Sequence, residues 1–320
     1  METSESNRGA PKRLGVLGTL VRDTIHLPGM GRPATAWGGI AYALAAFDHV
    51  LSAGWTVVPV IKTGSDTADR ALPFLRSFAT VCDMRFVRVV PEPSNRVELT
   101  YTTQADRVEV LTGGVPGWLP GELDEVLATL DALYVNFISG VELDLSGAVT
   151  VRDKLRGPSY ADLHSLFLDI ESEGRRSPRY LPSSGRWAGC FDTVQMNENE
   201  FKLFVRGAPD PWLVAEKAME GRLGTIVVTR GADGAEIMTG QQGGAPSGRE
   251  TVPVAGGPAT GDPTGCGDIW GATFFASVLG GAAPRPASRR ANRMACGKVG
   301  CTGAEAYRDA ASGDTGPGSE

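Results

Sequence analysis

The sequence predicts an α/β fold, in which a central, mostly parallel β-sheet has helices on both faces and a small antiparallel β lid beside it. The first observation is that short runs rich in β-branched residues alternate with longer runs of helical periodicity along most of the 320-residue chain. Such alternation produces parallel strands joined by helices that cover both faces of the sheet. The second observation is one segment, 85–111, which breaks this rhythm and predicts the lid.

The elements of the main domain follow one another in a regular order. The predicted strands are apolar runs rich in β-branched residues, at 13–20, 56–62, 132–139, 158–163, 192–197 and 225–231. The predicted helices repeat apolar residues at helical spacing, at 38–51, 67–79, 121–130, 198–205 and 212–221. We therefore expect one domain over 13–307. The polar or glycine-rich ends, 1–12 and 308–320, are predicted to be disordered tails.

The segment from Arg85 to Leu111 alternates apolar and polar residues for most of its length. This pattern is typical of antiparallel strands with one face in water. We expect a small sheet, built from about 20–36 and 85–112, that projects from the domain as a lid over its site. Edge strands favour pairing, so a homodimer, if the chain forms one, is expected to pair through the lid.

Composition and charge exclude several classes of function. The chain is 42% hydrophobic and 21% charged with a formal net charge of −6, so it offers no basic surface for nucleic acid or anionic lipid. The polar start does not resemble a signal peptide. The most apolar stretch, 38–61, is interrupted by Asp48 and His49, so it predicts a helix and a strand and not a membrane span. We expect a cytoplasmic protein.

The cysteines are scattered, at 82, 190, 266, 296 and 301. Their odd number and the absence of a secretory signal predict free thiols. Cys296 and Cys301 are close in the chain, but none of the three histidines lies near them, so we expect no zinc site.

Residues 261–268, GDPTGCGD, have the composition of an anion-binding loop. Glycines let the backbone approach a ligand, and the uncharged segment 269–284 predicts a buried helix whose first N–H groups face that ligand. A tight turn before a helix needs glycines as well, so the loop alone leaves both interpretations open. Asp268 would repel an anion, but it suits a base that takes a proton from an attacking hydroxyl.

The stretch DPTGCGD resembles the D-T-x-G-A-G-D signature of the ribokinase-like (PfkB) carbohydrate kinase family, with Pro263 and Cys266 as departures. Other segments resemble motifs of that family in the family's order: GVLGTLVRDTI, WGGIAYALAAF, QMNENE, VVTRGADGA and ANRMACGKVGCTG. The resemblance implies an ATP-dependent kinase that phosphorylates a hydroxyl of a sugar or sugar-like small molecule. It implies Asp268 as the base, with the backbone N–H groups of Gly265, Cys266 and Gly267 as the anion hole.

The acceptor site is expected from the resemblance and from individual residues. The resemblance places Asp23, Gly38 and Gly39 against the acceptor. Further candidates come from the residue types and their positions, namely Tyr42, Arg96 and Asn136. Tyr42 could stack on a ring or hydrogen-bond through its hydroxyl, and the other two stand in the lid and on a predicted strand.

For the donor, the resemblance implies ATP and Mg²⁺. Asn197 and Glu200 would organise the magnesium ion and its waters. Family members often bind a monovalent cation such as K⁺ beside the anion site, and Asp262 is the candidate ligand here. The residues implied at the nucleotide are Thr229, Gly231, Gly234, Thr264 and Asn292.

Many of these residues also have a purely structural interpretation. Asp23 could end a strand in a turn, and the adjacent glycine pair could let the following helix pack closely. Asn197 and Glu200 suit an N-cap and a first-turn partner of the helix dipole. For His164, capping or solvent contact is an alternative to a role near the phosphates.

Three alternatives to a sugar kinase remain. A nucleoside kinase of the same fold would need an aromatic slot, which Trp37 or Tyr42 could provide. Ala43 keeps this open, since family members that hold a furanose often have an asparagine there. A non-catalytic ligand sensor on the same fold would not need Asp268 as a base. A Rossmann dehydrogenase would need G-x-G-x-x-G after the first strand, which GVLG lacks.

Overall fold

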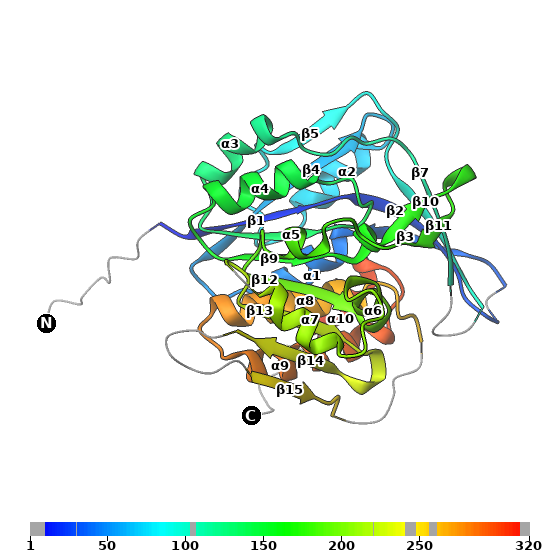
Figure 1. The fold of residues 1–320 in the computed structure, drawn as a ribbon. Coiled ribbons are helices and arrows are strands. Elements are labelled where there is room, and N and C mark those ends of the chain that lie inside the picture. The colour runs from blue at the N-terminus through cyan, green and yellow to red at the C-terminus, as the bar shows by residue number, and fades with distance from the viewer. Residues whose placement is uncertain are drawn as a thin grey trace, which may run out of the picture.

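The computed structural model describes residues 10–29, 31–102, 107–219, 221–240, 248–255 and 261–313. At its centre is a nine-stranded sheet in the order β15-β14-β13-β12-β9-β8-β1-β4-β5 (Figure 1). The strands are β1 (Lys12–Gly18), β4 (Trp55–Gly64), β5 (Val87–Val90), β8 (Ala132–Asn136), β9 (Ser159–Asp162), β12 (Thr193–Asn197), β13 (Thr225–Thr229), β14 (Ala235–Thr239) and β15 (Gly248–Val252). Only β14 runs opposite to the other strands, so its pairs with β13 and β15 are antiparallel and all other pairs are parallel. The predicted mostly parallel sheet is confirmed.

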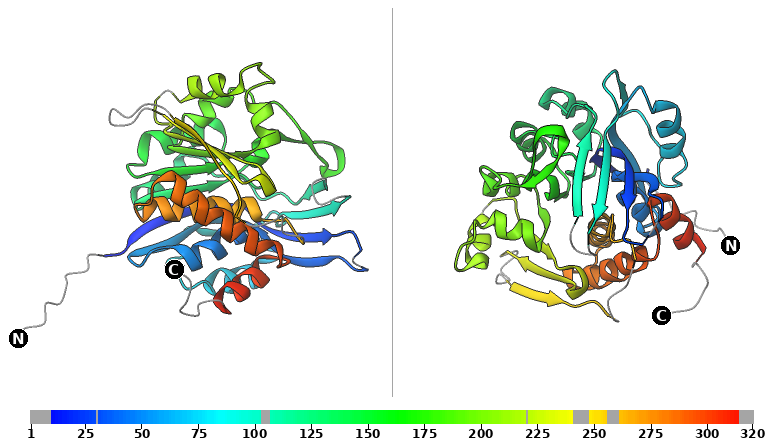
Figure 2. Two further views of the ribbon diagram at one scale, coloured as in Figure 1. Left: turned by 90° about the horizontal axis from the view of Figure 1, so that it is seen from below. Right: turned by 90° about the vertical axis from the view of Figure 1, so that its right-hand side faces the viewer.

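Helices cover both faces of the sheet (Figure 2). One layer contains α3 (Pro120–Ala128), α4 (Leu145–Lys154), α5 (Ser184–Ala188), α6 (Glu198–Phe204) and α7 (Pro211–Ala218). The other contains α1 (Ile40–Val50), α2 (Ala68–Arg76), α8 (Cys266–Leu279), α9 (Pro284–Val299) and α10 (Ala304–Gly313). Successive residues of a strand point to opposite faces, so Leu133 and Val135 pack in the first layer and Ala132 and Tyr134 in the second.

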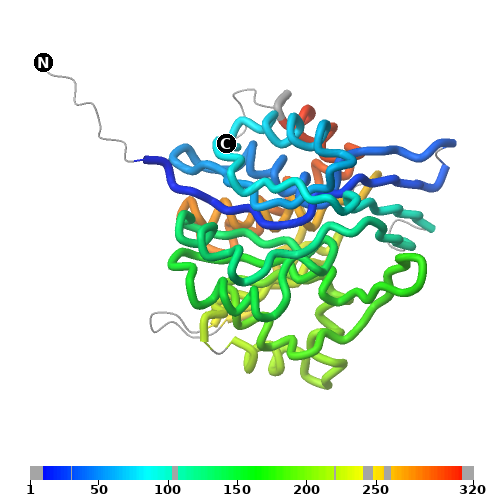
Figure 3. The backbone as a smooth tube through the Cα atoms, turned by 90° about the horizontal axis from the view of Figure 1, so that it is seen from above, coloured from blue at the N-terminus to red at the C-terminus, as the bar shows by residue number. Residues whose placement is uncertain are grey.

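The lid is a four-stranded sheet in the order β3-β2-β6-β7 that extends from one side of the domain (Figure 3). Its strands are β2 (Leu20–His26), β3 (Ala34–Gly39), β6 (Arg96–Tyr101) and β7 (Arg107–Thr112). The prediction of an antiparallel lid was wrong in one pair, because β2 and β6 are parallel. Both strands run outward from the carboxyl ends of central strands, β1 and β5, which gives them one direction. The predicted lid range also included β5, which instead pairs with β4 in the central sheet.

The predicted element bounds agree with the structure apart from a few places. The first predicted strand, 13–20, spans the end of β1 and the start of β2, so Asp23 lies on the lid and not on the central sheet. Helix α10 continues to Gly313, beyond the predicted domain end at 307. The rest of the predicted tails, 1–9 and 314–320, falls outside the described residues.

Two further features bear on expected partners. Within the described ranges, no helix is long and apolar enough to cross a membrane. On the lid, Val110 of β7 forms a β-bridge with Arg175 of the same chain, so part of this edge is already paired internally. A homodimer through the lid stays a prediction.

Candidate active site

Helix α8 begins directly after the glycine-rich loop, and the loop's shape depends on Gly265. This residue has a left-handed backbone with φ of +81°. A Cβ atom there would lie 2.4 Å from the ring of Tyr42, on α1, so the ring packs against bare backbone. Any other residue would meet both backbone strain and a clash. The apolar body of α8 is buried in the second helical layer, which gives the loop a rigid mount.

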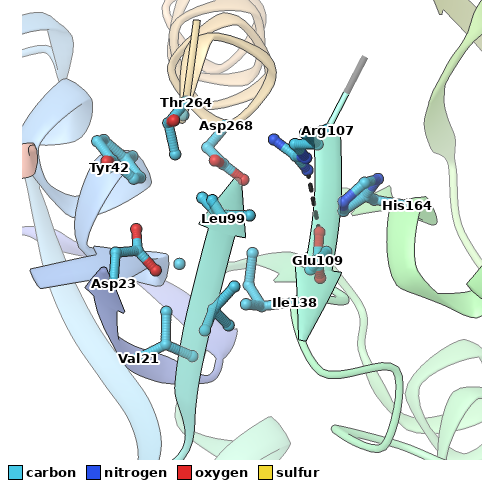
Figure 4. A pocket seen from close by; sticks show the side chains of 13 residues that line it. Val21, Asp23, Tyr42, Leu99, Arg107, Glu109, Ile138, His164, Thr264 and Asp268 are labelled. Carbon is cyan, nitrogen blue, oxygen red and sulfur yellow. Dashed lines mark hydrogen bonds and ion pairs between the residues drawn. The ribbon is translucent and has the colours of Figure 1, made fainter. Parts of the chain in front are cut away.

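Asp268 lies in the first turn of α8 and points into a cavity (Figure 4). Asn136, the last residue of β8, donates a hydrogen bond from Nδ2 to Asp268 Oδ1 at 2.6 Å. Burial raises the pKa of Asp268, and the hydrogen bond from Asn136 opposes that rise by stabilising the carboxylate. Asn136 was predicted to face the acceptor. Instead it is fully buried, does not line the cavity, and positions the carboxylate of Asp268.

The loop offers fewer free donors than predicted. The N–H group of Cys266 donates to the carbonyl of Pro263 at 3.1 Å and so closes a turn. No described residue accepts a hydrogen bond from the N–H group of Gly265 or of Gly267. These two groups remain as donors for an anion. Gln195, on β12, fixes the position of the loop, because its Nε2 donates a hydrogen bond to the carbonyl of Gly267 at 3.1 Å.

The cavity in front of Asp268 has a volume of about 60 Å³ and lies between the lid and the loop. Its lining combines aliphatic side chains with several charged and polar ones, and consists of Val21, Asp23, Gly39, Tyr42, Val97, Leu99, Arg107, Glu109, Ile138, His164, Thr264, Gly265 and Asp268. Thr264 connects the two walls, because its hydroxyl lies 2.9 Å from the hydroxyl of Tyr101 on β6. Polar groups that converge on one cavity are typical of small-molecule sites.

Asp23, on β2, is one of the polar groups that the lid contributes to this cavity. Its side chain is 2% exposed and, among the described residues, receives no hydrogen bond. Burial, with the nearby Glu109 carboxylate, raises the pKa of Asp23 well above its usual range. Gly38 makes this position possible, since a Cβ atom there would lie 1.8 Å from Asp23 Oδ2. The structure thus brings Asp23, Gly39 and Tyr42 together at the cavity, with Gly38 beside Asp23. Their contact with an acceptor stays a prediction.

The arginine of the lid that reaches the cavity is Arg107, and not Arg96 as predicted. Arg96 is exposed and forms an ion pair with Asp66 at 2.7 Å. Arg107, on β7, lines the cavity and pairs with Glu109 at 3.2 Å (Figure 4). Both arginines lie on alternating strands, and which face carries an arginine inward depends on strand register, which the sequence does not specify.

A second cavity, of about 380 Å³, adjoins the first and shares Arg107, Glu109 and His164 with it. Its other lining residues come from the lid, the 167–178 segment, α6 and the loop: Tyr101, Phe167, Leu168, Arg176, Pro178, Asn197, Asn199, Glu200, Leu203 and Pro263. Two adjoining cavities with Asp268 in the smaller one suit two reactants that meet at their junction.

His164 places a positive charge at this junction. Its Nδ1 lies 2.5 Å from Glu200 Oε1. Burial works against the charged ring, but the Glu200 carboxylate outweighs burial and raises the pKa of His164 to about 9. The ring is therefore protonated at neutral pH, which favours a role near phosphates over simple capping.

Asn197 and Glu200 form the capping box of α6. Asn197 Oδ1 accepts from the N–H groups of Asn199 at 2.9 Å and Glu200 at 3.0 Å, and Glu200 Oε2 accepts from the N–H group of Asn197 at 2.7 Å. Both residues line the second cavity, but their oxygens already accept these bonds. Within the described ranges, no group of three or more His, Cys, Asp or Glu could hold a metal ion. The pair therefore fits a hydrated magnesium ion held through water, and not direct ligation.

The residues predicted at the nucleotide lie in different surroundings. Thr264 lines the first cavity, whereas Thr229, Gly231 and Gly234 line neither cavity. Residues 241–247 and 256–260 lie outside the described ranges, so a nucleotide role for these three stays a prediction.

Asn292 is buried inside the protein. Its Nδ2 donates to the carbonyls of Val252 at 3.0 Å and Pro253 at 3.2 Å, and its Oδ1 accepts from Trp270 Nε1 at 2.7 Å. The predicted contact with a nucleotide is corrected, because this amide joins α8, α9 and β15 and has no free group for a base.

Asp262 also has a partner that sequence analysis missed. Its carbonyl accepts a hydrogen bond from Lys298 Nζ at 2.9 Å, and its Oδ2 lies 3.2 Å from the same nitrogen. Both side chains are almost completely buried. An internal ammonium therefore stands where Asp262 was expected to hold a monovalent cation.

A comparison with sequence models of protein families gives one decisive match. Residues 173–310 match the family described as pfkB family carbohydrate kinase. Over this segment, the chain belongs to the PfkB family. The match covers the α6 capping box and the loop with Asp268. The search of curated proteins found no match to the chain.

Solved structures show the same ribokinase-like fold. A sulfate complex of a pyrophosphate-dependent kinase in the ribokinase family has a TM-score of 0.74 at 16% identity, over 93% of this chain and 99% of that one. Ribokinase from Thermotoga maritima has a TM-score of 0.70 at 16% identity, over 94% and 98%. A Burkholderia thailandensis nucleoside kinase in complex with inosine has a TM-score of 0.68 at 17% identity, over 94% and 96%.

Proposed function

We propose that this PfkB-family kinase transfers a phosphoryl group from ATP to a hydroxyl of a sugar or sugar-like small molecule, with Asp268 as the base. The observation that carries the proposal is the position of Asp268. It lies in the first turn of α8, hydrogen-bonded by Asn136, beside the free N–H groups of Gly265 and Gly267, and it faces Asp23 across a cavity. A base, an anion hole and a hydroxyl-binding carboxylate within one cavity are the parts that this reaction needs.

The acceptor would bind between Asp23 and Asp268. The carboxyl of Asp23 has no hydrogen bond from a described residue, so it is free to bond acceptor hydroxyls. One hydroxyl would then lie within reach of Asp268, which takes its proton as the oxygen attacks phosphorus. A raised pKa makes the Asp268 carboxylate a stronger base than an exposed aspartate.

The transfer forms one bond and breaks one bond. The acceptor oxygen bonds to the γ-phosphorus, the bond from that phosphorus to the bridging oxygen breaks, and ADP leaves with the electron pair. The N–H groups of Gly265 and Gly267 would hold the transferred group, and each such donor contributes about 3–4 kcal/mol in preorganised sites. Arg107 and protonated His164, at the junction of the two cavities, would stabilise the donor's phosphates.

Magnesium supplies charge neutralisation on the donor's phosphates when it is bound. Asn197 and Glu200 would contact it through water in the second cavity. Their capping box keeps both side chains in place before the donor arrives.

A sugar or sugar-like acceptor is favoured over a nucleoside by the aromatic residues. Trp37, one candidate for stacking on a nucleobase, does not line the cavity. It instead stacks on Phe74, with the ring centres 5.4 Å apart. The ring of Tyr42 lines the cavity but packs on Gly265. The other apolar lining residues are aliphatic and offer no face on which a base could stack.

Pyrophosphate is a second candidate donor. Asn292, which was expected at the nucleotide base, is instead bonded within the protein. A donor without a base would not need that contact, and a related fold is that of a pyrophosphate-dependent kinase.

The function is tested with a panel of sugars, polyols, sugar phosphates and nucleosides, each assayed with Mg-ATP and with magnesium pyrophosphate. We expect one class of sugar-like acceptors to raise ADP release well above the rate without acceptor. Faster turnover with pyrophosphate than with ATP would identify pyrophosphate, and not ATP, as the donor. Binding of ATP with no acceptor-dependent ADP across the panel would contradict the kinase and favour a sensor.

Replacing Asn136 with leucine is expected to move the acid limb of the pH profile of kcat/KM to higher pH. The reason is that the hydrogen bond from Asn136 lowers the pKa of Asp268, so its loss lets burial raise that pKa further. Asp268 must be ionised to act as a base, so activity is then lost at a higher pH as the medium is acidified. The measurement is kcat/KM for the acceptor against pH. Asn292→Leu, which removes a buried amide that does not touch Asp268, is the control. A limb that stays in place in Asn136→Leu would contradict the assignment of the limb to Asp268.

A further inference from the structure

Lys298 is a completely buried lysine in the last turn of α9. Its Nζ donates to the carbonyl of Asp262 at 2.9 Å, lies 3.2 Å from Asp262 Oδ2, and stands 5.5 Å from the centre of the Tyr42 ring. Burying an ammonium is costly unless other groups compensate it. Here a carboxylate, a carbonyl and an aromatic face do so.

These contacts connect Lys298 to the anion loop in two ways. Asp262 Oδ1 accepts from the N–H group of Thr264 at 2.9 Å, so the carboxylate that pairs with Lys298 also orients the loop. The ring of Tyr42 packs on Gly265, one of the two free donors. The ammonium therefore lies behind the loop and adjoins the groups that fix its shape.

We propose that Lys298 is the resident cation of the active site: its ammonium stands in place of a free monovalent cation, holds the anion loop in shape, and makes the enzyme independent of K⁺. A carbonyl and a carboxylate oxygen turned toward one buried charge are the ligands that a monovalent cation would take, and Lys298 occupies both. Lys298 is a positioning residue, because it acts through Asp262 and does not touch the reactants. The part of the proposal that concerns turnover rests on the proposed kinase function.

Another buried lysine offers a matched control. Lys62, 7% exposed, donates to the carbonyl of Gly117 at 2.8 Å and pairs with Glu122 at 2.8 Å, so it also holds one carbonyl and one carboxylate. It lies near a separate small cavity that shares no residue with the two cavities of the candidate site. If Lys298 only joins two elements, its variants should respond to added monovalent cations no more than a Lys62 variant does. If Lys298 is a resident cation, its alanine variant should respond and the Lys62 variant should not.

The first experiment compares thermal unfolding of the wild type, Lys298→Ala, Lys298→Met and Lys62→Met in K⁺, NH₄⁺ and tetramethylammonium at equal ionic strength. We expect the Tm of the wild type to change by less than about 1 °C. Alanine leaves space beside Asp262, so K⁺ or NH₄⁺ is expected to raise the Tm of Lys298→Ala saturably, by roughly 2–4 °C over tetramethylammonium. Lys298→Met fills the space with an apolar chain and Lys62→Met empties a different site, so neither should respond. This measurement needs no acceptor.

The second experiment measures kcat and KM of the same proteins with the acceptor found by the panel. We expect Lys298→Met to lower kcat by roughly 10–100-fold with little change in acceptor KM, and K⁺ or NH₄⁺ to restore part of the kcat of Lys298→Ala. Lys62→Met should keep the wild-type kcat. If no acceptor is found, the melting experiment still decides on Lys298, and the missing turnover counts only against the kinase function.

Three results would overturn the proposal. They are a saturable K⁺ response of the wild type in either experiment, a wild-type kcat in Lys298→Met, and a Tm of Lys298→Ala that is the same in all three cations. If neither Lys298 variant folds, the wild type decides: an equal Tm in K⁺ and tetramethylammonium supports the proposal, and a saturable rise with K⁺ overturns it.

Discussion

Asp268→Asn is expected to lower acceptor phosphorylation by about 10²–10⁴-fold, the usual contribution of a positioned general base. Asparagine keeps the size of the side chain but cannot take a proton from the acceptor hydroxyl. The hydrogen bond from Asn136 requires an oxygen, which the asparagine also carries. Burial disfavours the charged form of Asp268, so a neutral side chain should leave Tm unchanged or slightly higher. The measurement is single-turnover phosphorylation, with ATP binding followed by calorimetry.

The control for this prediction is Asp153→Asn. Asp153 is exposed in α4 and forms an ion pair with Arg152. Neither residue lines either cavity of the candidate site. Its replacement should leave turnover and Tm near the wild-type values. Asp268→Asn with undiminished turnover would refute the base assignment, whereas loss of ATP binding together with turnover would point to a role in the donor site.

Gly265→Ala is expected to lower turnover by about 10²–10³-fold, the usual cost of losing one donor of an anion hole. The new Cβ atom would lie 2.4 Å from the ring of Tyr42, so the loop must move and carry the N–H groups of Gly265 and Gly267 with it. The φ of +81° adds strain of about 1–3 kcal/mol. The measurements are kcat, acceptor KM and Tm, and we expect kcat to fall more than KM rises.

Gly281→Ala separates the two effects. Gly281 follows the other end of α8, has a φ of +89°, and would place its Cβ atom in open space. The alanine there should therefore lower the free energy of unfolding through backbone strain while turnover stays near the wild-type value. Equal loss of turnover in both variants would mean that Gly265 acts through stability alone and not through the shape of the anion hole.

The parts of the site whose arrangement could be predicted depend on local sequence. Gly265 and Asp268 stand in one loop and the helix turn that follows it, so their relative positions follow from that short segment. The six inner strands of the central sheet were predictable for a similar reason, because each shows its own apolar pattern, whereas β5, β14 and β15 at its edges were not predicted as strands of this sheet. Asp23 and Gly38 lie close together because β2 and β3 are neighbours in sequence and pair in the lid.

The parts that failed depend on how distant segments meet. Arg96 and Arg107 look alike in an alternating sequence, and only the register of β6 and β7 decides which one faces inward. Asn292 was expected at the nucleotide from the family resemblance alone, and the carbonyls of Val252 and Pro253 that bond it come from a distant part of the chain. Lys298 resembles an ordinary cation at a helix C-terminus, where lysine is usually solvated. Its burial appears only when α9 is packed against the loop.

Phosphoryl transfer with Asp268 as the base is tested by following label from [γ-³²P]ATP to an acceptor from the panel, with the product identified by mass spectrometry. We expect the wild type to give a singly phosphorylated acceptor that carries the label, and Asp268→Asn to give almost none under the same conditions. Label that appears only as inorganic phosphate, or an equal yield of labelled acceptor with Asp268→Asn, would contradict it.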